Sequence, residues 1–197
     1  MSALPAPGLG DPVHDAQRAF RVALGALSRP GRIQELPGAI AGVELGAAQA
    51  RLLLTLTDES TAVWWQSGSQ ALQRWLRFHT GARTAAGTEE ADFAAVMQSR
   101  EMPPLAQFMA GPAAAPERSS TLLVEVPSLT AGAAMQARGP GIDGHVGIAL
   151  AGLPDRFWSE WQANQAAFPQ GVDIFFTCGD RFLGLPRTSR VGRMEGA

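Results

Sequence analysis

Near the middle of the chain, the run TLLVEV at 121–126 has the composition of a strand buried inside a sheet. Aliphatic and β-branched residues dominate it, which is typical of strands covered on both faces. A second such run, VDIFFTC, follows at 172–178. We expect VEV at 124–126 and IFF at 174–176 to lie in the interior of one sheet. Segments with helical periodicity surround both runs, so the class is α/β.

The first expected helix begins after Asp11, which can cap it, and ends at SRPG (28–31). Its apolar residues recur at helical spacing at Val13, Ala16, Phe20, Leu24 and Leu27. The segment 46–57 is ambiguous, because its alanines favour helix whereas LLLTLT favours a strand. A helix is preferred, since a turn at 58–60 then leads into the strand 61–65.

Two more helices are expected, one after a cap at Ser69 and ending at Gly81, and one beginning at Pro154. A short helix should run from Pro103 to Met109. The other expected strands are 32–36, 92–97, 134–138, 145–150 and 181–186, the last joined to 172–178 by a hairpin turn at Gly179-Asp180.

These elements predict one three-layer α/β/α domain with a mixed sheet over residues 11–191. Residues 1–10 are expected to be a flexible N-terminal tail and 192–197 a C-terminal tail. A length of 197 residues suits a single domain, and 46% hydrophobic residues suffice for its core.

The charge and the apolar pattern exclude several classes of protein. A net charge of −2 gives no global attraction to nucleic acid or to anionic membranes. No apolar run is long enough for a transmembrane helix, and the N-terminus does not resemble a signal peptide. A single cysteine cannot form an internal disulfide. We therefore expect a cytoplasmic protein.

All 16 basic residues are arginines, and the chain contains no lysine. A chain without lysine cannot form the internal aldimine of a pyridoxal phosphate enzyme, nor supply the lysine of a phosphate-binding P-loop. It also lacks the cysteines for an iron–sulfur cluster. We expect no cofactor and no metal.

The one thiol, Cys178, stands beside a Gly-Asp-Arg turn and invites comparison with a nucleophilic cysteine. A cysteine phosphatase needs an arginine six residues after the cysteine, but that position is Gly184. Free cysteines are also among the most buried residue types. Cys178 is therefore predicted to be an inert packed thiol.

No histidine pair has the spacing of a metal site, since His14, His79 and His145 lie far apart. His79 ends a helix, where it can bind the last carbonyl groups or serve a ligand.

Arg77, Arg138 and Arg187 each stand at the end of an element. A guanidinium there can bind phosphate in bidentate fashion, although it can equally cap carbonyl groups or pair with acids. Arg77, His79, Arg138 and Arg187 are the predicted sites for binding phosphate or a partner. No catalytic residue is assigned, and the turn Gly139-Pro140-Gly141 can be either a phosphate contact or a plain hairpin turn.

Five stretches in order resemble the PhnH family of the bacterial carbon–phosphorus lyase system. They are AFRVALGALSRPG (19–31), LLLTLTDESTAVWW (52–65), LRFHTGA (76–82), RGPGI (138–142) and FPQGVDIFFTCGDRFLGLPRTSRV (168–191). Together they span the domain, and the alanine-rich segment 83–118 is the least similar.

The resemblance implies a non-autonomous subunit of phosphonate catabolism, which acts with PhnG, PhnI, PhnJ, PhnL and PhnK type proteins. That system replaces the adenine of ATP by a phosphonate, forming a ribose 1-phosphonate 5-triphosphate. The resemblance also implies a fold like that of pyridoxal-phosphate-dependent transferases without the cofactor site, and a homodimer when the subunit is alone. An independent enzyme that uses the arginine loops, or a pure scaffold, remains an alternative.

Overall fold

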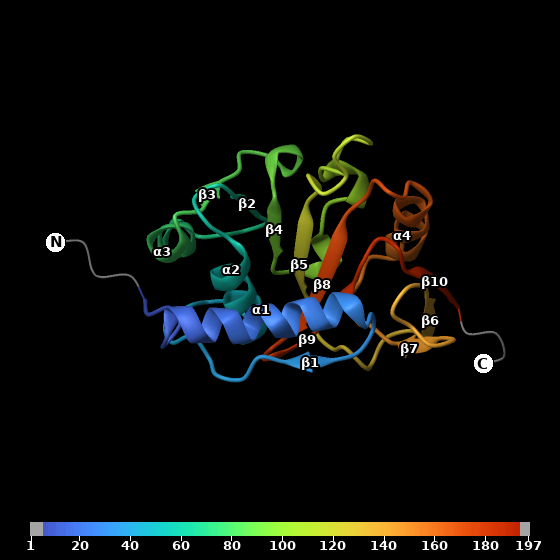
Figure 1. Ribbon diagram of the computed structural model, residues 1–197, viewed down its shortest axis with the longest axis horizontal. Helices are drawn as coiled ribbons and strands as arrows, with labels where there is room; N and C mark the ends of the chain where they lie inside the picture. Colours follow the sequence, from blue (N-terminus) through green and yellow to red (C-terminus); the bar gives the residue numbers. More distant parts are fainter. Residues whose placement is uncertain (1–5, 194–197) are drawn as a thin grey trace.

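The computed structural model describes residues 6–193, and its main feature is a seven-stranded mixed sheet with the order β1-β9-β8-β5-β4-β2-β3 (Figure 1). Its strands are β1 (Gln34–Glu35), β2 (Ala62–Trp65), β3 (Arg83–Thr84), β4 (Phe93–Val96), β5 (Thr121–Glu125), β8 (Asp173–Cys178) and β9 (Arg181–Leu185). Strands β3, β2, β4, β5 and β8 run parallel, whereas β9 is antiparallel to both β8 and β1. The expected α/β class and mixed sheet are confirmed.

One face of the sheet is covered by the helices α1 (Pro12–Ser28), α2 (Ala47–Leu56) and α3 (Gln70–Thr80). Gln49 holds α2 on the sheet, because its Nε2 donates to the carbonyls of Val96 and Leu123 over 3.1 and 2.9 Å. Inward side chains of β5 and β8, including Leu123 and Phe175, complete this half of the core.

The opposite face carries α4 (Phe157–Ala166) and a separate three-stranded antiparallel sheet with the order β10-β6-β7. This small sheet consists of β6 (Met135–Arg138), β7 (Val146–Ile148) and β10 (Arg190–Arg193). The chain therefore has three layers, but one outer layer combines a helix with a sheet. Buried Phe157 and Trp161 of α4 pack in the same core cluster as Phe176 of β8.

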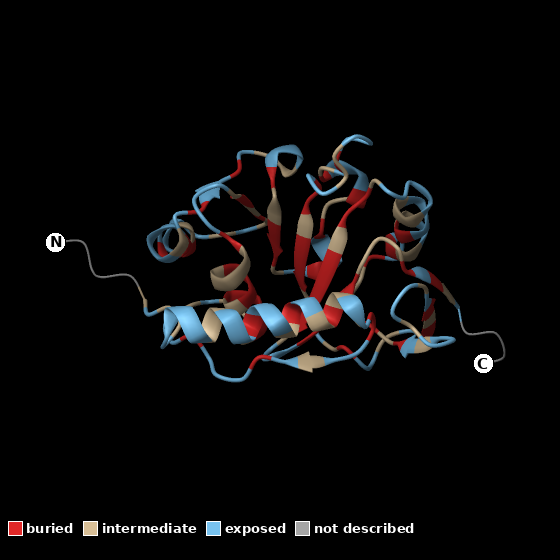
Figure 2. Cartoon of the chain, viewed as in Figure 1, coloured by how far each residue is buried: buried red, intermediate tan, exposed pale blue. Residues whose placement is uncertain are grey.

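The strand TLLVEV occupies the centre of the main sheet, as its composition predicts (Figure 2). Leu122, Leu123 and Val124 are fully buried, and so are Ile174 and Phe176 on β8. Glu125 is the exception in this interior and is only partly buried.

Helix α1 starts where expected. The Asp11 carboxylate accepts hydrogen bonds from the N–H groups of Val13 and His14, and the bond from His14 lowers the pKa of this carboxyl. However, α1 buries Ala19, Ala23 and Ala26 rather than the larger residues of the expected apolar face. Val13, Phe20 and Leu24 are 73%, 51% and 57% exposed. Alanines occupy the inward face because their small side chains let the helix approach α2 and β9 closely.

Several other boundaries differ from the expected ones. The segment after Pro103 forms only a 3₁₀ turn at Leu105–Gln107, η3, and α4 begins at Phe157 rather than at Pro154. Two further 3₁₀ turns, η1 (Thr88–Glu90) and η2 (Ser99–Glu101), and the short strand β3 were not anticipated. Strand β10 was also missed, and it includes residues 192 and 193 of the expected C-terminal tail.

Part of the expected N-terminal tail contacts the domain. Trp75 on α3 donates from Nε1 to the carbonyl of Pro7 over 3.1 Å, and Ala6 and Leu9 pack against the core beneath α1 to α3. Residues 1–5 and 194–197 lie outside the described residues. Within residues 6–193, no helix combines the length and apolar character that crossing a membrane requires.

Candidate functional site

A cavity of about 610 Å³ lies at the carboxyl ends of the parallel strands β4, β5 and β8. It is lined by Met97, Gln98, Ser99, Arg100, Glu101, Glu125, Val126, Pro127, Gly152 and Cys178. Open α/β sheets bind ligands at this edge, and the volume falls within the range of small-molecule sites. We call it the strand-end cavity.

Glu125 is the acid that the fold places at this edge. Its carboxylate accepts hydrogen bonds from the hydroxyl of Thr177 and, over 3.0 Å, from the N–H of Gly179. Gly46, the N-terminal cap of α2, lies so close that a methyl group there would come within 2.6 Å of Oε2. The N-terminus of α2 therefore lies beside this carboxylate. The site offers a fixed negative charge that can accept a hydrogen bond.

Cys178 is partly buried in the same cavity rather than enclosed in the core. Its Sγ lies 3.6 Å from the carbonyl oxygen of Pro127, a contact that suits a thiol donor. Its side chain packs against the core cluster that contains Phe176. This geometry gives the thiol a packing role at the cavity wall.

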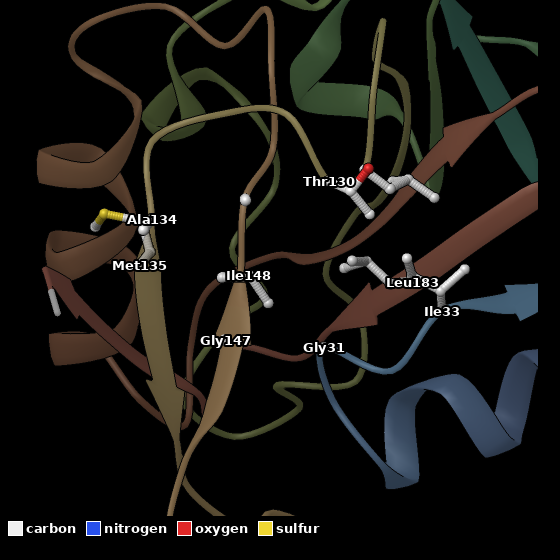
Figure 3. A pocket seen from close by; sticks show the side chains of 10 residues that line it. Gly31, Ile33, Thr130, Ala134, Met135, Gly147, Ile148 and Leu183 are labelled. Carbon is white, nitrogen blue, oxygen red and sulfur yellow. The ribbon is translucent and has the colours of Figure 1, made fainter. Parts of the chain in front are cut away.

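Two further hollows have a different character. One, of about 280 Å³, lies between the small sheet and β9, where Ile33, Ile148 and Leu183 face it (Figure 3). Its walls are almost entirely apolar, and Thr130 supplies the one side-chain hydroxyl. The other hollow, of about 310 Å³, lies on the small sheet and is lined by Arg138, Arg190 and Arg193.

The predicted residues Arg77 and His79 lie together in the last turn of α3. Arg77 is exposed, and the carbonyl of this residue accepts the N–H of Gly81. The His79 Nε2 is bound to the carbonyl of Ala6 over 2.9 Å, and its ring packs edge-on against Phe78 and Trp75. The observed contacts of His79 therefore serve the N-terminal segment.

Arg187 belongs to the opposite, amino-terminal edge of the main sheet. Its guanidinium binds the carboxylate of Asp173 at the start of β8 and also donates to the Pro116 carbonyl and the Ser119 hydroxyl. The side chain is 12% exposed. These bonds occupy the donors that a phosphate would need, so the geometry favours a structural role.

Arg138 lies on the small sheet, far from Arg77 and His79, because α3 and β6 occupy opposite ends of the molecule (Figure 1). The glycines that follow it are explained by packing. A methyl group at Gly141 would lie 2.1 Å from the carbonyl oxygen of Ser28, and one at Gly139 would lie 3.0 Å from that of Thr188. The turn thus matches the hairpin alternative.

Within residues 6–193, no group of three or more histidine, cysteine, aspartate or glutamate side chains is arranged to hold a metal ion. Sequence reasoning missed Glu125, because a glutamate inside VEV resembled an ordinary alternation within a strand. The position of Glu125 in the sequence could have identified it, because an acid at the last position of a central parallel strand lies at the edge of the sheet where ligands bind.

Comparisons with known proteins agree over nearly the whole chain. Residues 7–192 match a protein family described as bacterial phosphonate metabolism protein (PhnH). The chain is 40% identical, over 93% of both sequences, to the alpha-D-ribose 1-methylphosphonate 5-triphosphate synthase subunit PhnH of Rhizobium meliloti (strain 1021). It is 30% identical to HtxG of Stutzerimonas stutzeri, named as a candidate C-P lyase subunit, over 92% of this chain and 87% of that protein.

Proposed function

Because the chain belongs to the PhnH family of bacterial phosphonate metabolism proteins, we propose that it is a subunit of ribose 1-methylphosphonate 5-triphosphate synthase. In this role it works with partner subunits to replace the adenine of ATP by a phosphonate, and it supplies no complete catalytic site of its own. The match over residues 7–192 carries the proposal, since it includes every described helix and all but the last residue of the sheets.

The partners that fit this role are PhnG, PhnI and PhnJ type subunits, joined by PhnL and PhnK type proteins, in the cytoplasm. The exposed apolar residues of α1, which are Val13, Phe20 and Leu24, support a subunit role. We call them the α1 stripe and assign it to contact with a partner subunit of the synthase. Isolated, the chain is expected to form a homodimer. Its three layers and lack of lysine suit a relative of the pyridoxal-phosphate-dependent transferase fold that has no cofactor site.

The proposal is tested by co-expression with PhnG, PhnI and PhnJ type subunits. We expect co-purification at a fixed stoichiometry, and restored growth on methylphosphonate when the chain replaces the corresponding subunit in a bacterium that lacks it. Failure of both would contradict the assignment. A neutral surface variant such as Arg74→Gln serves as the control.

An independent enzyme acting through Arg187 or His79 is less well supported. Both side chains are bound to groups of the chain itself, so neither is free to serve a substrate as observed. Activity of the isolated protein on phosphonate and ATP would reverse this preference.

A further inference from the structure

We propose that the outer face of the small sheet binds a chain of phosphate groups through Arg138 and Arg190. These residues are directly opposite one another in the antiparallel pair β6 and β10. Directly opposite residues project from the same face of a sheet. Both arginines are exposed, whereas their neighbours Ala137 and Val191 are buried. The two guanidinium groups therefore stand on the solvent side.

The outward-facing positions next to the arginine pair carry almost no side chains. Gly192 pairs with Gln136, and Gln136 pairs with Gly147, so one glutamine and two glycines cross all three strands. A methyl group at Gly147 or Gly192 would meet no atom within 4 Å. Glycine inside a strand weakens it and often marks a place where a ligand approaches the backbone. Beside the arginine pair, the backbone of this face is therefore accessible to a ligand.

The arginine pair is electrostatically unfavourable without an anion. Like charges directly opposite one another destabilise a strand pair. Among residues 6–193, neither Arg138 nor Arg190 forms a salt bridge with an acidic side chain. Arg193 lines the same hollow and adds to the positive charge. A bound polyanion would remove the repulsion and be held by both guanidinium groups.

The size of the face favours a small anion over a protein partner. Strands of three and four residues, spaced by about 4.8 Å, cover only on the order of 100 Å². A stable protein interface takes about 800 Å² from each partner. The hollow of about 310 Å³ suits a ligand of a few phosphate groups, and arginine binds phosphate in bidentate fashion. Two neighbouring guanidinium groups can each take a different phosphate of one chain.

The proposed function supplies the natural source of such a ligand, since both ATP and the 5-triphosphate product carry a triphosphate. The identity of the physiological ligand rests on that function, but the site itself does not. Inorganic tripolyphosphate presents the same groups without the nucleoside, so it tests the arginine face alone.

The experiment is isothermal titration of the full-length protein with inorganic tripolyphosphate at low ionic strength. We expect Arg138→Gln and Arg190→Gln each to raise the Kd about tenfold, as the loss of one charge-assisted contact predicts. The double variant should bind weakest. The control Arg74→Gln/Arg83→Gln removes the same charge from two exposed arginines of α3 and β3, at the other end of the molecule (Figure 1), and should change the Kd less than threefold. Matching melting temperatures would show that all variants fold.

Equal binding by the wild type and the Arg138→Gln/Arg190→Gln variant would overturn the inference, and so would absence of binding to the wild type. If the Arg138→Gln/Arg190→Gln variant binds tripolyphosphate unchanged but no longer co-purifies with partner subunits, the inference is overturned, and the two arginines bind an acidic surface of a partner protein instead. The proposed function fails separately. If the arginines bind tripolyphosphate but the chain joins no synthase complex, the site stands and the subunit assignment falls.

Discussion

Arg187 and Asp173 are joined by two side-chain hydrogen bonds, from Nε to Oδ1 over 3.1 Å and from Nη2 to Oδ2 over 2.5 Å. The backbone N–H of Arg187 donates to the same carboxylate over 2.7 Å. The guanidinium also reaches Pro116 and Ser119, which precede β5. One arginine therefore ties the chain after β9 to the starts of two central parallel strands.

Arg187→Ala is expected to lower the free energy of unfolding by about 2–4 kcal/mol, because it leaves Asp173 partly buried without its charged partner. Arg187→Lys keeps the charge but not the bidentate geometry, so it should lose less. Urea unfolding of both variants measures the effect, with Arg74→Ala on exposed α3 as the control, expected within about 0.5 kcal/mol of wild type. An Arg187→Ala protein of unchanged stability that fails to bind its ligand or partner would show that the role is functional.

Glu125→Gln is expected to reduce turnover by the assembled synthase while it lowers the free energy of unfolding only modestly. The substitution removes the negative charge from the strand-end cavity. It also replaces one of the two oxygens that accept hydrogen bonds from Thr177 and Gly179, which should lower the free energy of unfolding by about 1–2 kcal/mol. Thr177→Val removes the hydroxyl but leaves the carboxylate in the cavity, so it separates stability from function. If Thr177→Val and Glu125→Gln lower turnover equally, Glu125 only supports the fold.

The sequence predicted the elements that depend on local signals. Asp11, Ser69 and Gly81 cap helices as their types suggest, and Gly179 turns the hairpin with a φ of 62°. The centre of the main sheet was also predictable, because the consecutive apolar residues at 122–124 cover both faces of the strand. These features need no knowledge of distant contacts.

What depends on tertiary packing could not be read in the same way. Periodicity predicted the larger apolar residues of α1, such as Phe20 and Leu24, on its inward face, which was wrong. The close contact with α2 and β9 selects the alanines instead. The small sheet needs β10, whose RVGR sequence has no strand signal apart from its partner β6. Arg138 was therefore identified as a single residue, while its relation to Arg190 follows from the pairing. The sequence also left the guanidinium of Arg187 available for a phosphate, because its actual partners, Asp173 and Ser119, are distant in sequence.

The α1 stripe gives a prediction about assembly. Phe20→Ser is expected to weaken co-purification with the partner subunits while the melting temperature changes little, because the ring is already 51% exposed. Phe168→Ser is the matched control, since this phenylalanine is 57% exposed at the other side of the domain after α4. Quantitative pull-down of the co-expressed complex measures the effect. Equal losses for both variants, or none for Phe20→Ser, would contradict the assignment of this surface.

Cys178 tests whether the strand-end cavity is used at all. As a partly buried thiol bonded to the Pro127 carbonyl, it should react with iodoacetamide much more slowly in the native protein than in urea. Cys178→Ala should keep full function in the complex, since the thiol is expected only to pack. Complete alkylation, in contrast, places an extra group in a cavity of about 610 Å³ and should inhibit if a ligand binds there.

Three measurements on Cys178 separate the possibilities: the alkylation rate, the activity of Cys178→Ala, and the activity of the alkylated wild type. A slow thiol with an active alanine variant and an inhibited adduct means that the cavity is occupied during turnover. An active adduct means that the cavity is not part of the working site. Rapid alkylation together with an inactive alanine variant would contradict the packing role, because only a thiol with its own chemistry gives both results.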